Sequence, residues 1–385
     1  MAHHLPPRSL RRAVLLGLIT CILLPAVPAS APAAALTLGK RAVVTGLENP
    51  VTFAFTPDER IFYGERFTGE IHIFDPATRQ DDLFASFSVG QLQEQGLLGV
   101  VLHPDYPAKP FVYVYLTRDL SGGAGTNVRN QILRIRDLDG TAGRTKILME
   151  NSVGPAHNGG ELAFGPDGML YALIGEKTAP ANAQDLSNVF GKVIRMTPKG
   201  EIPADNPFVG RPGVNGYLYD YGHRNGFGLA FDPVSGALWQ SEAGPECNDE
   251  INRIIPGRNY GWGTHATCST PPEAPLNTNQ DGPRPVLPKA FFAPVITPDG
   301  MSFCSSCGLG AGAEGDLFFG YFLDMGAPDG APRSGIRQAS ISSNRMRIRS
   351  VAIALPNNRF VFTVESAPNG SLYFSDSVGI YELTA

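Results

Sequence analysis

One local pattern recurs along the chain: a turn made of Pro, Asp, Asn or Gly leads directly into a strand of β-branched and aromatic residues. Copies of it occupy residues 56–63, 103–115, 165–171, 232–239 and 368–374. Strand-bearing units about fifty residues apart have the length of a four-stranded propeller blade, and about six of them fill the chain. The repeats therefore predict an all-β fold, a six-bladed β-propeller of four-stranded antiparallel blades.

A pair of β-sandwiches is the competing architecture, since sandwich strands also lie between turns. The recurrence of one turn-strand unit, and the near absence of long amphipathic patterns, favours the propeller. A propeller has an axial cleft walled by loops from several blades. Its ligand-binding residues are therefore expected to lie far apart in the sequence.

The formal net charge is −5, and the basic residues form no cluster. Nucleic acid and anionic membrane surfaces are therefore not expected partners. A small or neutral ligand fits this charge distribution better. The 44 Gly and 33 Pro residues are aperiodic and separate short β-rich runs, which indicates a turn-rich β protein rather than disorder.

The N-terminal residues have the pattern of an export signal. Three arginines precede the uncharged run 13–27, and small Ala-rich residues follow it. This order predicts a cleaved secretory signal peptide over 1–35 and a single propeller domain over 36–385. A transmembrane anchor is the alternative, but the run is short and contains Pro25. We therefore expect a periplasmic or secreted protein without stable membrane insertion after signal cleavage.

Export also makes the cysteines informative. Four remain when Cys21 of the signal region is set aside, an even number in an oxidising compartment, so two disulfides are expected. The most local of the three possible pairings joins Cys247 to Cys268 and Cys304 to Cys307. A zinc site of four thiolates is the alternative, but reduced thiolates are disfavoured outside the cytoplasm.

A polar motif stands out near the middle of the chain. His223, Arg224 and Asn225 lie side by side on a Gly-flanked turn within 221–231. Burying an imidazole, a cation and an amide without partners is costly, so this stretch is expected to face a cleft that holds an anionic or carbonyl-rich ligand. The motif marks the place where function is expected.

A set of short motifs runs in order from about Leu38 to Trp262. Its members lie at residues 95–100, 103–105, 157–160, 165–168, 184–185, 191–195, 202–208, 222–225, 242–245, 249–252 and 259–262. Together they resemble the soluble PQQ-dependent aldose sugar dehydrogenases of the glucose/sorbosone dehydrogenase family. Any one tripeptide would be weak, but the ordered set is specific. The C-terminal third carries much less of the resemblance.

The resemblance implies a six-bladed propeller and an activity. The family carries pyrroloquinoline quinone (PQQ), which takes a hydride from the anomeric carbon of an aldose and yields a lactone. This chemistry needs a base for the hydroxyl proton, and a neutral imidazole suits that role near neutral pH. His157 occupies the family's base position. Taken alone, His157 would be a turn histidine ahead of Gly159 and Gly160.

The resemblance also implies the residues that hold PQQ. A cation and fixed hydrogen-bond donors stabilise the oxyanion that develops as a quinone accepts a hydride. Arg224 and Asn225 match the family positions that hold the quinone oxygens, and Arg224 thereby shares in catalysis. Gln95 matches a further cofactor contact, although its polar neighbours are also typical of a solvated turn.

Calcium is the second implied cofactor. The ion bound to PQQ would be held by the backbone carbonyls of Gly244 and Pro245, since a hard cation prefers oxygen ligands. A structural calcium ion is suggested by Glu250 with the backbone carbonyl of Tyr260. Glu250 could equally cap its segment or form a salt bridge.

Two departures from the family pattern affect these assignments. Ala156 precedes the base where glucose-oxidising members carry an acidic residue, which leaves sugar orientation and substrate choice open. The basic residues that pair with the PQQ carboxylates come from the late blades, and that region is rewritten here. Arg337, together with Arg333, is the best substitute.

Two other functions stay open. One is a secreted propeller of the same family that has lost the cofactor and serves as a binding module, although His157, Arg224 and Gln95 together argue against it. The other is a propeller lactonase or glycan hydrolase, for which the chain offers no separate set of convergent carboxylates. The expected partners are a small sugar substrate and an electron acceptor that leaves no motif.

Overall fold

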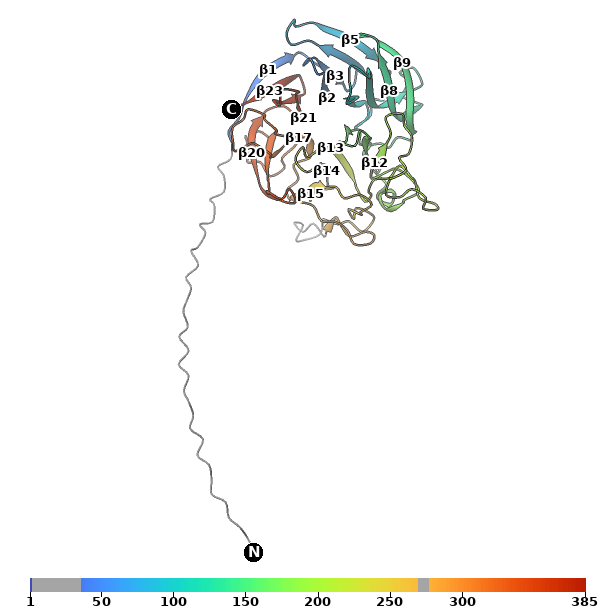
Figure 1. Ribbon diagram of the computed structural model, residues 1–385, viewed down its shortest axis with the longest axis vertical. Helices are drawn as coiled ribbons and strands as arrows, with labels where there is room; N and C mark the ends of the chain where they lie inside the picture. Colours follow the sequence, from blue (N-terminus) through green and yellow to red (C-terminus); the bar gives the residue numbers. More distant parts are fainter. Residues whose placement is uncertain (2–35, 269–276) are drawn as a thin grey trace. The chain divides into compact units, whose positions relative to one another are not determined.

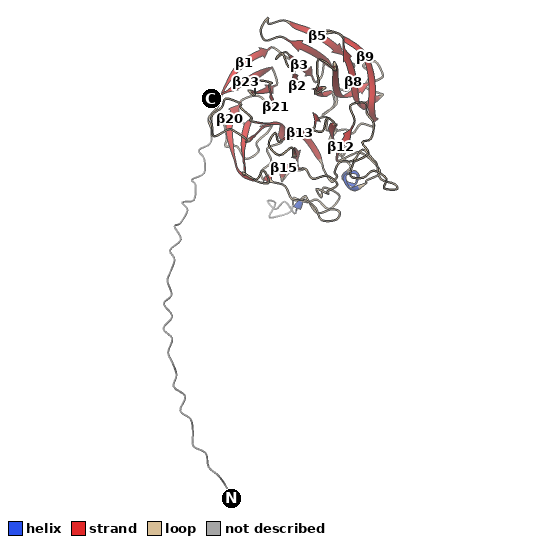
Figure 2. Ribbon diagram, viewed as in Figure 1, coloured by secondary structure: helices blue, strands red, loops and turns tan. Residues whose placement is uncertain are grey.

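Antiparallel sheets follow one another around a central axis as the six blades of a propeller (Figure 1), which confirms the predicted fold class. The computed structural model describes residue 1, residues 36–268 and residues 277–385. Apart from Met1, the predicted signal peptide over 1–35 lies outside the described residues. Figure 2 shows that strands dominate the ring. No helix in the described ranges is long and apolar enough to cross a membrane.

The blades take the strands in sequence order. Blade 1 contains β2 (Pro50–Phe55), β3 (Ile61–Glu65), β4 (Glu70–Phe74) and β5 (Asp81–Ser86). Blade 2 contains β6 (Leu97–Leu102), β7 (Phe111–Asp119), β8 (Val128–Asp137) and β9 (Ala142–Asn151). Blade 3 contains β10 (Leu162–Phe164), β11 (Leu170–Ile174) and β12 (Lys192–Met196).

The second half of the chain builds three more blades. Blade 4 contains β13 (Asn225–Phe231), β14 (Leu238–Ala243), β15 (Asp249–Arg253) and β16 (Ala290–Phe292). Blade 5 contains β17 (Pro298–Phe303), β18 (Leu317–Tyr321), β19 (Ser334–Ile341) and β20 (Ile348–Asn357). Blade 6 contains β21 (Val361–Ser366), β22 (Leu372–Asp376), β23 (Gly379–Thr384) and β1 (Gly39–Thr45).

The ring is closed by pairing the first strand with the last. Strand β1 lies antiparallel to β23, with Gly39 opposite Thr384 and Thr45 opposite Gly379. Because every other blade takes its strands from one continuous segment, this pairing is the non-covalent clasp that joins the two ends of the propeller.

Blade 3 departs from the predicted four-strand pattern, since its sheet has three strands in the described part of the chain. The fourth position is taken by the segment that follows β12, in which Leu218 forms a single antiparallel bridge with Ile194. Pro and Gly are frequent in residues 203–213. Because Pro donates no ladder hydrogen bond, this segment does not continue as a strand.

The hydrophobic core is divided among the interfaces between neighbouring blades. Phe62 of blade 1 packs with Leu97 of blade 2 in one cluster. Trp239 of blade 4 packs with Phe319 of blade 5 in another. Both faces of a blade are thus covered by its neighbours, so the inner strands are nearly continuous apolar runs.

Both predicted disulfides are present, and they leave none of these four cysteines free for zinc. Cys247 is bonded to Cys268, which ties the turn after β14 to the loop that follows β15. Cys304 is bonded to Cys307 in the connection from β17 to β18.

The innermost strands β2, β6, β10, β13, β17 and β21 all run in the same direction along the axis. We call the end of the ring at which they begin the upper end, and the opposite end the lower end. Asn225 is the first residue of β13, so the motif singled out in the sequence lies at the upper end.

Candidate active site

His157 lies at the upper end, in the connection from β9 to β10, with its imidazole held by a buried carboxylate. Nδ1 of His157 is hydrogen-bonded to Oε1 of Glu176, whose side chain is 1% exposed. A carboxylate can only accept, so Nδ1 carries the proton and Nε2 is left as the basic nitrogen. No described residue bonds to Nε2 in the structure, and the side chain is 13% exposed. The ring is therefore oriented as a proton acceptor.

The backbone of His157 is fixed as firmly as its ring. The residue has a positive φ of 56°, an uncommon conformation for a residue other than Gly. Its N–H donates to Oε2 of Glu94 at 2.6 Å, and its carbonyl accepts the N–H of Lys177 at 3.0 Å. A Cβ at Gly175 would lie 2.3 Å from that carbonyl, so only Gly allows β11 to approach the His157 loop this closely.

Arg224 brings a cation to the same end of the axis. Its Nη1 donates to the carbonyl of Ala243 at 3.0 Å, and its guanidinium lies 5.6 Å from the ring centroid of Trp262. Burial lowers the pKa of Arg224, while the carboxylates of Glu176 and Glu94 are among those that oppose this shift. The guanidinium is thus a partly desolvated cation beside the carboxylate that orients His157.

Asn225 connects the two halves of this arrangement. Its side-chain Oδ1 accepts the N–H of Gly159 at 3.3 Å, and its Nδ2 donates to Oε2 of Glu94 at 3.0 Å. The side chain is buried, and one of its two amide hydrogens has no acceptor among the described residues. The predicted residues His157, Arg224 and Asn225 therefore meet around Glu94.

Gln95 is not part of this cluster. Its side chain is buried inside blade 2, where Oε1 accepts the N–H of Leu92 at 3.3 Å and lies against Gly90. The residue before it, Glu94, points toward the axis and bonds His157 and Asn225. The run of polar residues around Gln95 indicated that this turn could contribute to a site. It did not show whether the side chain of Glu94 or that of Gln95 faces the axis.

The turn after β14 offers oxygen atoms suited to a cation. The carbonyls of Gly244 and Pro245 accept no hydrogen bond from any described residue. Asp249 holds the turn from beneath, because its carboxylate accepts the N–H of Gly244 at 2.7 Å and those of Ile296 and Thr297 at 2.6 Å. Burial raises the pKa of Asp249 to about 6, although these bonds oppose the shift.

A buried charged cluster lies behind this turn. The imidazole of His223 is 1% exposed and contacts Glu242 through Nδ1 at 2.7 Å and Asp220 through Nε2 at 3.1 Å. Burial opposes protonation, yet the two carboxylates raise the pKa of His223 to about 10. Both ring nitrogens are occupied, so His223 is a structural cation rather than a base.

Glu250 adds a third carboxylate to this cluster. Burial and the charge of Glu242 raise its pKa to about 8. Asn279 bonds both Glu250 and the carbonyl of Tyr260, the latter at 2.7 Å. The Glu250 carboxylate and the Tyr260 carbonyl, which were predicted to share a calcium ion, therefore both contact the side-chain amide of Asn279. The carboxyl groups of Glu242, Asp220 and Glu250 outnumber the imidazolium of His223 in this cluster.

A cavity of about 210 Å³ lies on the axis directly below the His157 loop. Its walls are apolar at Val51, Leu98, Phe227, Phe322 and Phe362, and its charged lining consists of Arg66, Glu94, Glu161 and Asp299. We call it the upper cavity. Arg66 donates from Nε to the carbonyl of Gln95 at 3.0 Å. It is the one basic residue among the described residues that line this cavity.

The structure places Arg337 away from the axis. It lies on β19, the third strand of blade 5, and Nη2 pairs with Asp324 at 2.5 Å. Its guanidinium also lies over the ring of Tyr321, 4.8 Å from the centroid. Arg333 is 45% exposed and lies 4.0 Å from Asp329. Neither arginine lines the upper cavity.

Comparisons with known proteins identify the family of the chain. Residues 47–376 match the family model described as Glucose / Sorbosone dehydrogenase. The chain is 31% identical over 252 residues to quinoprotein glucose dehydrogenase B of Acinetobacter calcoaceticus, covering 58% of this chain and 52% of that one. It is 33% identical over 243 residues to aldose sugar dehydrogenase YliI of Escherichia coli, covering 60% and 63%. These alignments thus span about half to two thirds of either relative.

A solved structure extends the likeness over nearly the whole fold. The PQQ-bound aldose sugar dehydrogenase of Streptomyces coelicolor superposes with a TM-score of 0.74 at 28% identity, covering 92% of this chain and 99% of that one. Fold, cluster and relatives together define an oxidoreductase that acts on CH–OH groups. The chain belongs to the glucose/sorbosone dehydrogenase family.

Proposed function

We propose that the protein oxidises aldose sugars at the anomeric carbon to lactones, using PQQ and calcium, with His157 as the general base. The observation that carries the proposal is the oriented imidazole: Nδ1 is held by buried Glu176, and no described residue occupies Nε2. This arrangement suits the removal of a hydroxyl proton as a hydride leaves the adjoining carbon.

The residues of this chain have separate roles in the proposed reaction. Nε2 of His157 takes the hydroxyl proton, and the carboxylate of Glu176 stabilises the imidazolium that results. Arg224 presents a guanidinium beside them, with one of its five N–H groups committed to Ala243. Asn225 fixes the position of Glu94 and of the His157 loop, which keeps the base in place.

The upper end fits a planar, anionic quinone. Nε1 of Trp262 is buried without a hydrogen-bond partner among the described residues, and the Trp262 ring lies beside the Arg224 guanidinium. Arg224, Asn225 and Trp262 are the residues that would hold PQQ, with Arg66 as the cation below them. Bound PQQ would supply the hydride acceptor, which no amino-acid side chain provides.

The carbonyls of Gly244 and Pro245, which accept no hydrogen bond from a described residue, fit calcium, which takes six to eight oxygen ligands. We assign a second, structural calcium ion to Glu250 and the Tyr260 carbonyl. Support for it comes from the carboxylate excess around His223, because three buried carboxylates face one imidazolium there. Asn279 would have to release the Tyr260 carbonyl to allow direct ligation.

We further propose that residues 1–35 are a signal peptide and that the mature propeller, residues 36–385, is periplasmic or secreted. The two disulfides support an oxidising compartment. The electron acceptor that reoxidises the cofactor is external to this chain. The lack of an acidic residue at Ala156 leaves the preferred aldose to be determined by assay.

The test uses chelator-treated, mature protein titrated with PQQ and calcium. Quinone binding is followed by the change in its absorbance, and activity by reduction of an artificial dye across a panel of aldoses. We expect stoichiometric binding and sugar-dependent dye reduction. Failure to bind PQQ, together with inactivity on every sugar, would instead support the binding module.

A further inference from the structure

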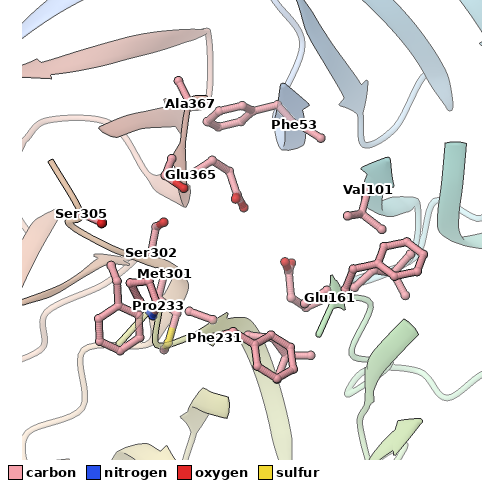
Figure 3. A pocket seen from close by; sticks show the side chains of 18 of the residues that line it. Phe53, Val101, Glu161, Phe231, Pro233, Met301, Ser302, Ser305, Glu365 and Ala367 are labelled. Atoms are coloured by element: carbon pink, nitrogen blue, oxygen red, sulfur yellow. The ribbon is translucent and has the colours of Figure 1, made fainter. Parts of the chain in front are cut away.

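The propeller axis is also hollow at the lower end. A cavity of about 420 Å³ lies there, and Figure 3 shows Glu161 and Glu365 pointing toward one another across it. No described histidine or cysteine lines this cavity, so it offers carboxylates without a second kind of metal ligand. A different group of carboxylates, on blade 1, does include a histidine.

His72 lies among three carboxylates on one face of blade 1. Glu70 precedes it by two residues on β4, so both side chains point to the same face of the sheet. Glu65 is the last residue of β3, and Asp81 is the first residue of β5. Tyr63 of β3 is paired with His72 in the ladder, and the two rings are stacked with centroids 5.1 Å apart. Three adjacent strands therefore bring these side chains together.

The spacing of the cluster suits a metal ion. Glu65, Glu70 and His72 each offer one ligand atom, and these atoms lie within 4.8 Å of one another. Nε2 of His72 is 3.4 Å from Oε2 of Glu70. Two ligands of a tetrahedral zinc ion, each about 2.1 Å from the metal, are about 3.4 Å apart. The His72–Glu70 contact therefore has the separation of two ligands that share one ion.

An ion pair accounts less well for the position of the His72 ring. Nε2 faces Glu70 and Nδ1 faces Asp81, each at 3.4 Å. A charge-assisted N–H···O bond measures about 2.7–2.9 Å. Every other imidazole–carboxylate contact between described residues is 3.1 Å or shorter. Nδ1 of His72 is also buried without a hydrogen-bond partner among the described residues. A direct ion pair would draw these groups closer, whereas a metal ion between Nε2 and Glu70 holds them at this separation.

The cluster also carries an excess of negative charge. Within the described part of the chain, Glu70 and Asp81 form ion pairs with His72 alone, and Glu65 forms none. Three carboxylates and an imidazolium sum to −2, whereas three carboxylates, a neutral imidazole and a divalent cation sum to −1. The hydroxyl of Tyr63 donates to Oδ2 of Asp81 at 2.7 Å, which leaves the charge unchanged. A divalent cation thus balances this face of the blade better than a proton does.

We propose that this face of blade 1 binds zinc or a similar divalent transition metal, with Nε2 of His72 and one carboxylate oxygen each of Glu70 and Glu65 as ligands. An imidazole nitrogen beside carboxylate oxygens suits zinc, whereas calcium and magnesium take oxygen ligands. Asp81 orients His72 through Nδ1, since a ligating histidine commonly directs its second nitrogen to a carboxylate. Water takes the fourth position, because the Glu70 side chain is 38% exposed.

The ion acts as a structural link close to the point where the ring closes. Oε1 of Glu65 accepts the N–H of Glu48 at 2.8 Å, and Oε2 accepts the hydroxyl of Thr68 at 3.2 Å. Each carboxylate oxygen has two lone pairs, so Glu65 can keep these bonds and still bind the metal. Glu48 belongs to the connection from the clasp strand β1 into blade 1. The site is separate from the carbonyls of Gly244 and Pro245 on blade 4.

Zinc is the probe for the test, because its binding can be counted without PQQ or sugar. Untagged mature protein is stripped of metals, saturated with calcium and titrated with zinc in equilibrium dialysis. The wild type should bind one zinc ion that His72→Gln and Glu70→Gln bind at least about 100-fold more weakly. Asp81→Asn should keep the count and weaken the affinity about 10- to 100-fold. The matched control is His265→Gln, which removes an exposed imidazole paired with Asp281 and should bind zinc as the wild type does.

Further measurements separate loss of the site from loss of the fold. Circular dichroism should show that His72→Gln and Glu70→Gln keep the β-sheet spectrum. Zinc should raise the melting temperature of the wild type but not that of either variant. Equal zinc counts and affinities in all three proteins, or no stoichiometric binding by the wild type, would overturn the proposal and indicate an imidazolium held between carboxylates. Because neither quinone nor sugar is present, this result is independent of the proposed sugar oxidation.

Discussion

The contact between His157 and Glu176 gives the sharpest test of the proposed mechanism. In Glu176→Gln, the side chain keeps its shape but loses its charge. The glutamine can donate its amide hydrogens to Nδ1, which would place the imidazole proton on Nε2 and remove the base. The Glu176 side chain is 1% exposed, so solvent cannot replace the missing charge.

The expected magnitude follows from the bond that is lost. A hydrogen bond to a charged group contributes about 1.5–3 kcal/mol, and each 1.36 kcal/mol is a factor of about ten in rate. The stabilisation of the imidazolium alone therefore accounts for a loss of about 10- to 150-fold in kcat. The wrong imidazole tautomer would lower kcat further. The comparable Asp-to-Asn change in a Ser-His-Asp triad lowers kcat by about 10⁴-fold, which sets an upper bound on the total loss.

The assay is steady-state dye reduction by the enzyme loaded with PQQ and calcium. We expect kcat to fall at least about tenfold while KM for the sugar and binding of PQQ change little, because Glu176 acts through His157. Glu201→Gln, an exposed carboxylate in the turn after β12, is the control. A folded Glu176→Gln enzyme with kcat within about threefold of the wild type would refute the assigned role of Glu176.

Three further predictions follow from other parts of the structure. His157→Ala should lose at least about 10²-fold in turnover yet bind PQQ normally by absorbance titration; an unchanged rate removes it from the mechanism. Burial lowers the pKa of Lys192 to about 7, so the folded protein binds this proton less tightly than the unfolded chain. Lys192 should therefore contribute a rise in stability between about pH 7 and 10 of at most about 1.4 kcal/mol per pH unit, which opposes the fall contributed by His223, and urea unfolding of Lys192→Met should differ from that of the wild type by this slope. Replacing both Cys247 and Cys268 by Ser opens a cross-link of sequence separation 21 and should cost about 3 kcal/mol in the same assay. Equal stability would mean that this loop is constrained by other contacts.

The fold could be predicted because its evidence is local and repeated. Each turn-strand unit is encoded within a few residues, and the observed blades follow the predicted spacing. The exception is the outer edge of blade 3, where the chain runs irregularly and Leu218 makes one bridge. Turn signals in that segment look the same as those between ordinary strands, so the sequence did not reveal the missing strand.

The candidate site could be predicted where residues match the family pattern. His157, Arg224 and Asn225 were predicted from that resemblance, and the structure brings them together. Glu94 and Glu176 were missed, because their role depends on which side chains lie next to them in the folded chain. Glu176 lies 19 residues beyond His157, and only the pairing of β10 with β11 brings the two together.

The contrast between Arg337 and Arg66 shows why charge partners on a propeller are hard to read from sequence. A side chain on a third strand packs against the next blade, and Arg337 accordingly meets Asp324 and Tyr321. Residues that reach the axis come from the inner strands or from the loops at either end of a blade. Arg66 follows β3 directly and enters the upper cavity from such a loop. The position within the blade, rather than the kind of charge, therefore decides which arginine faces the axial cavity.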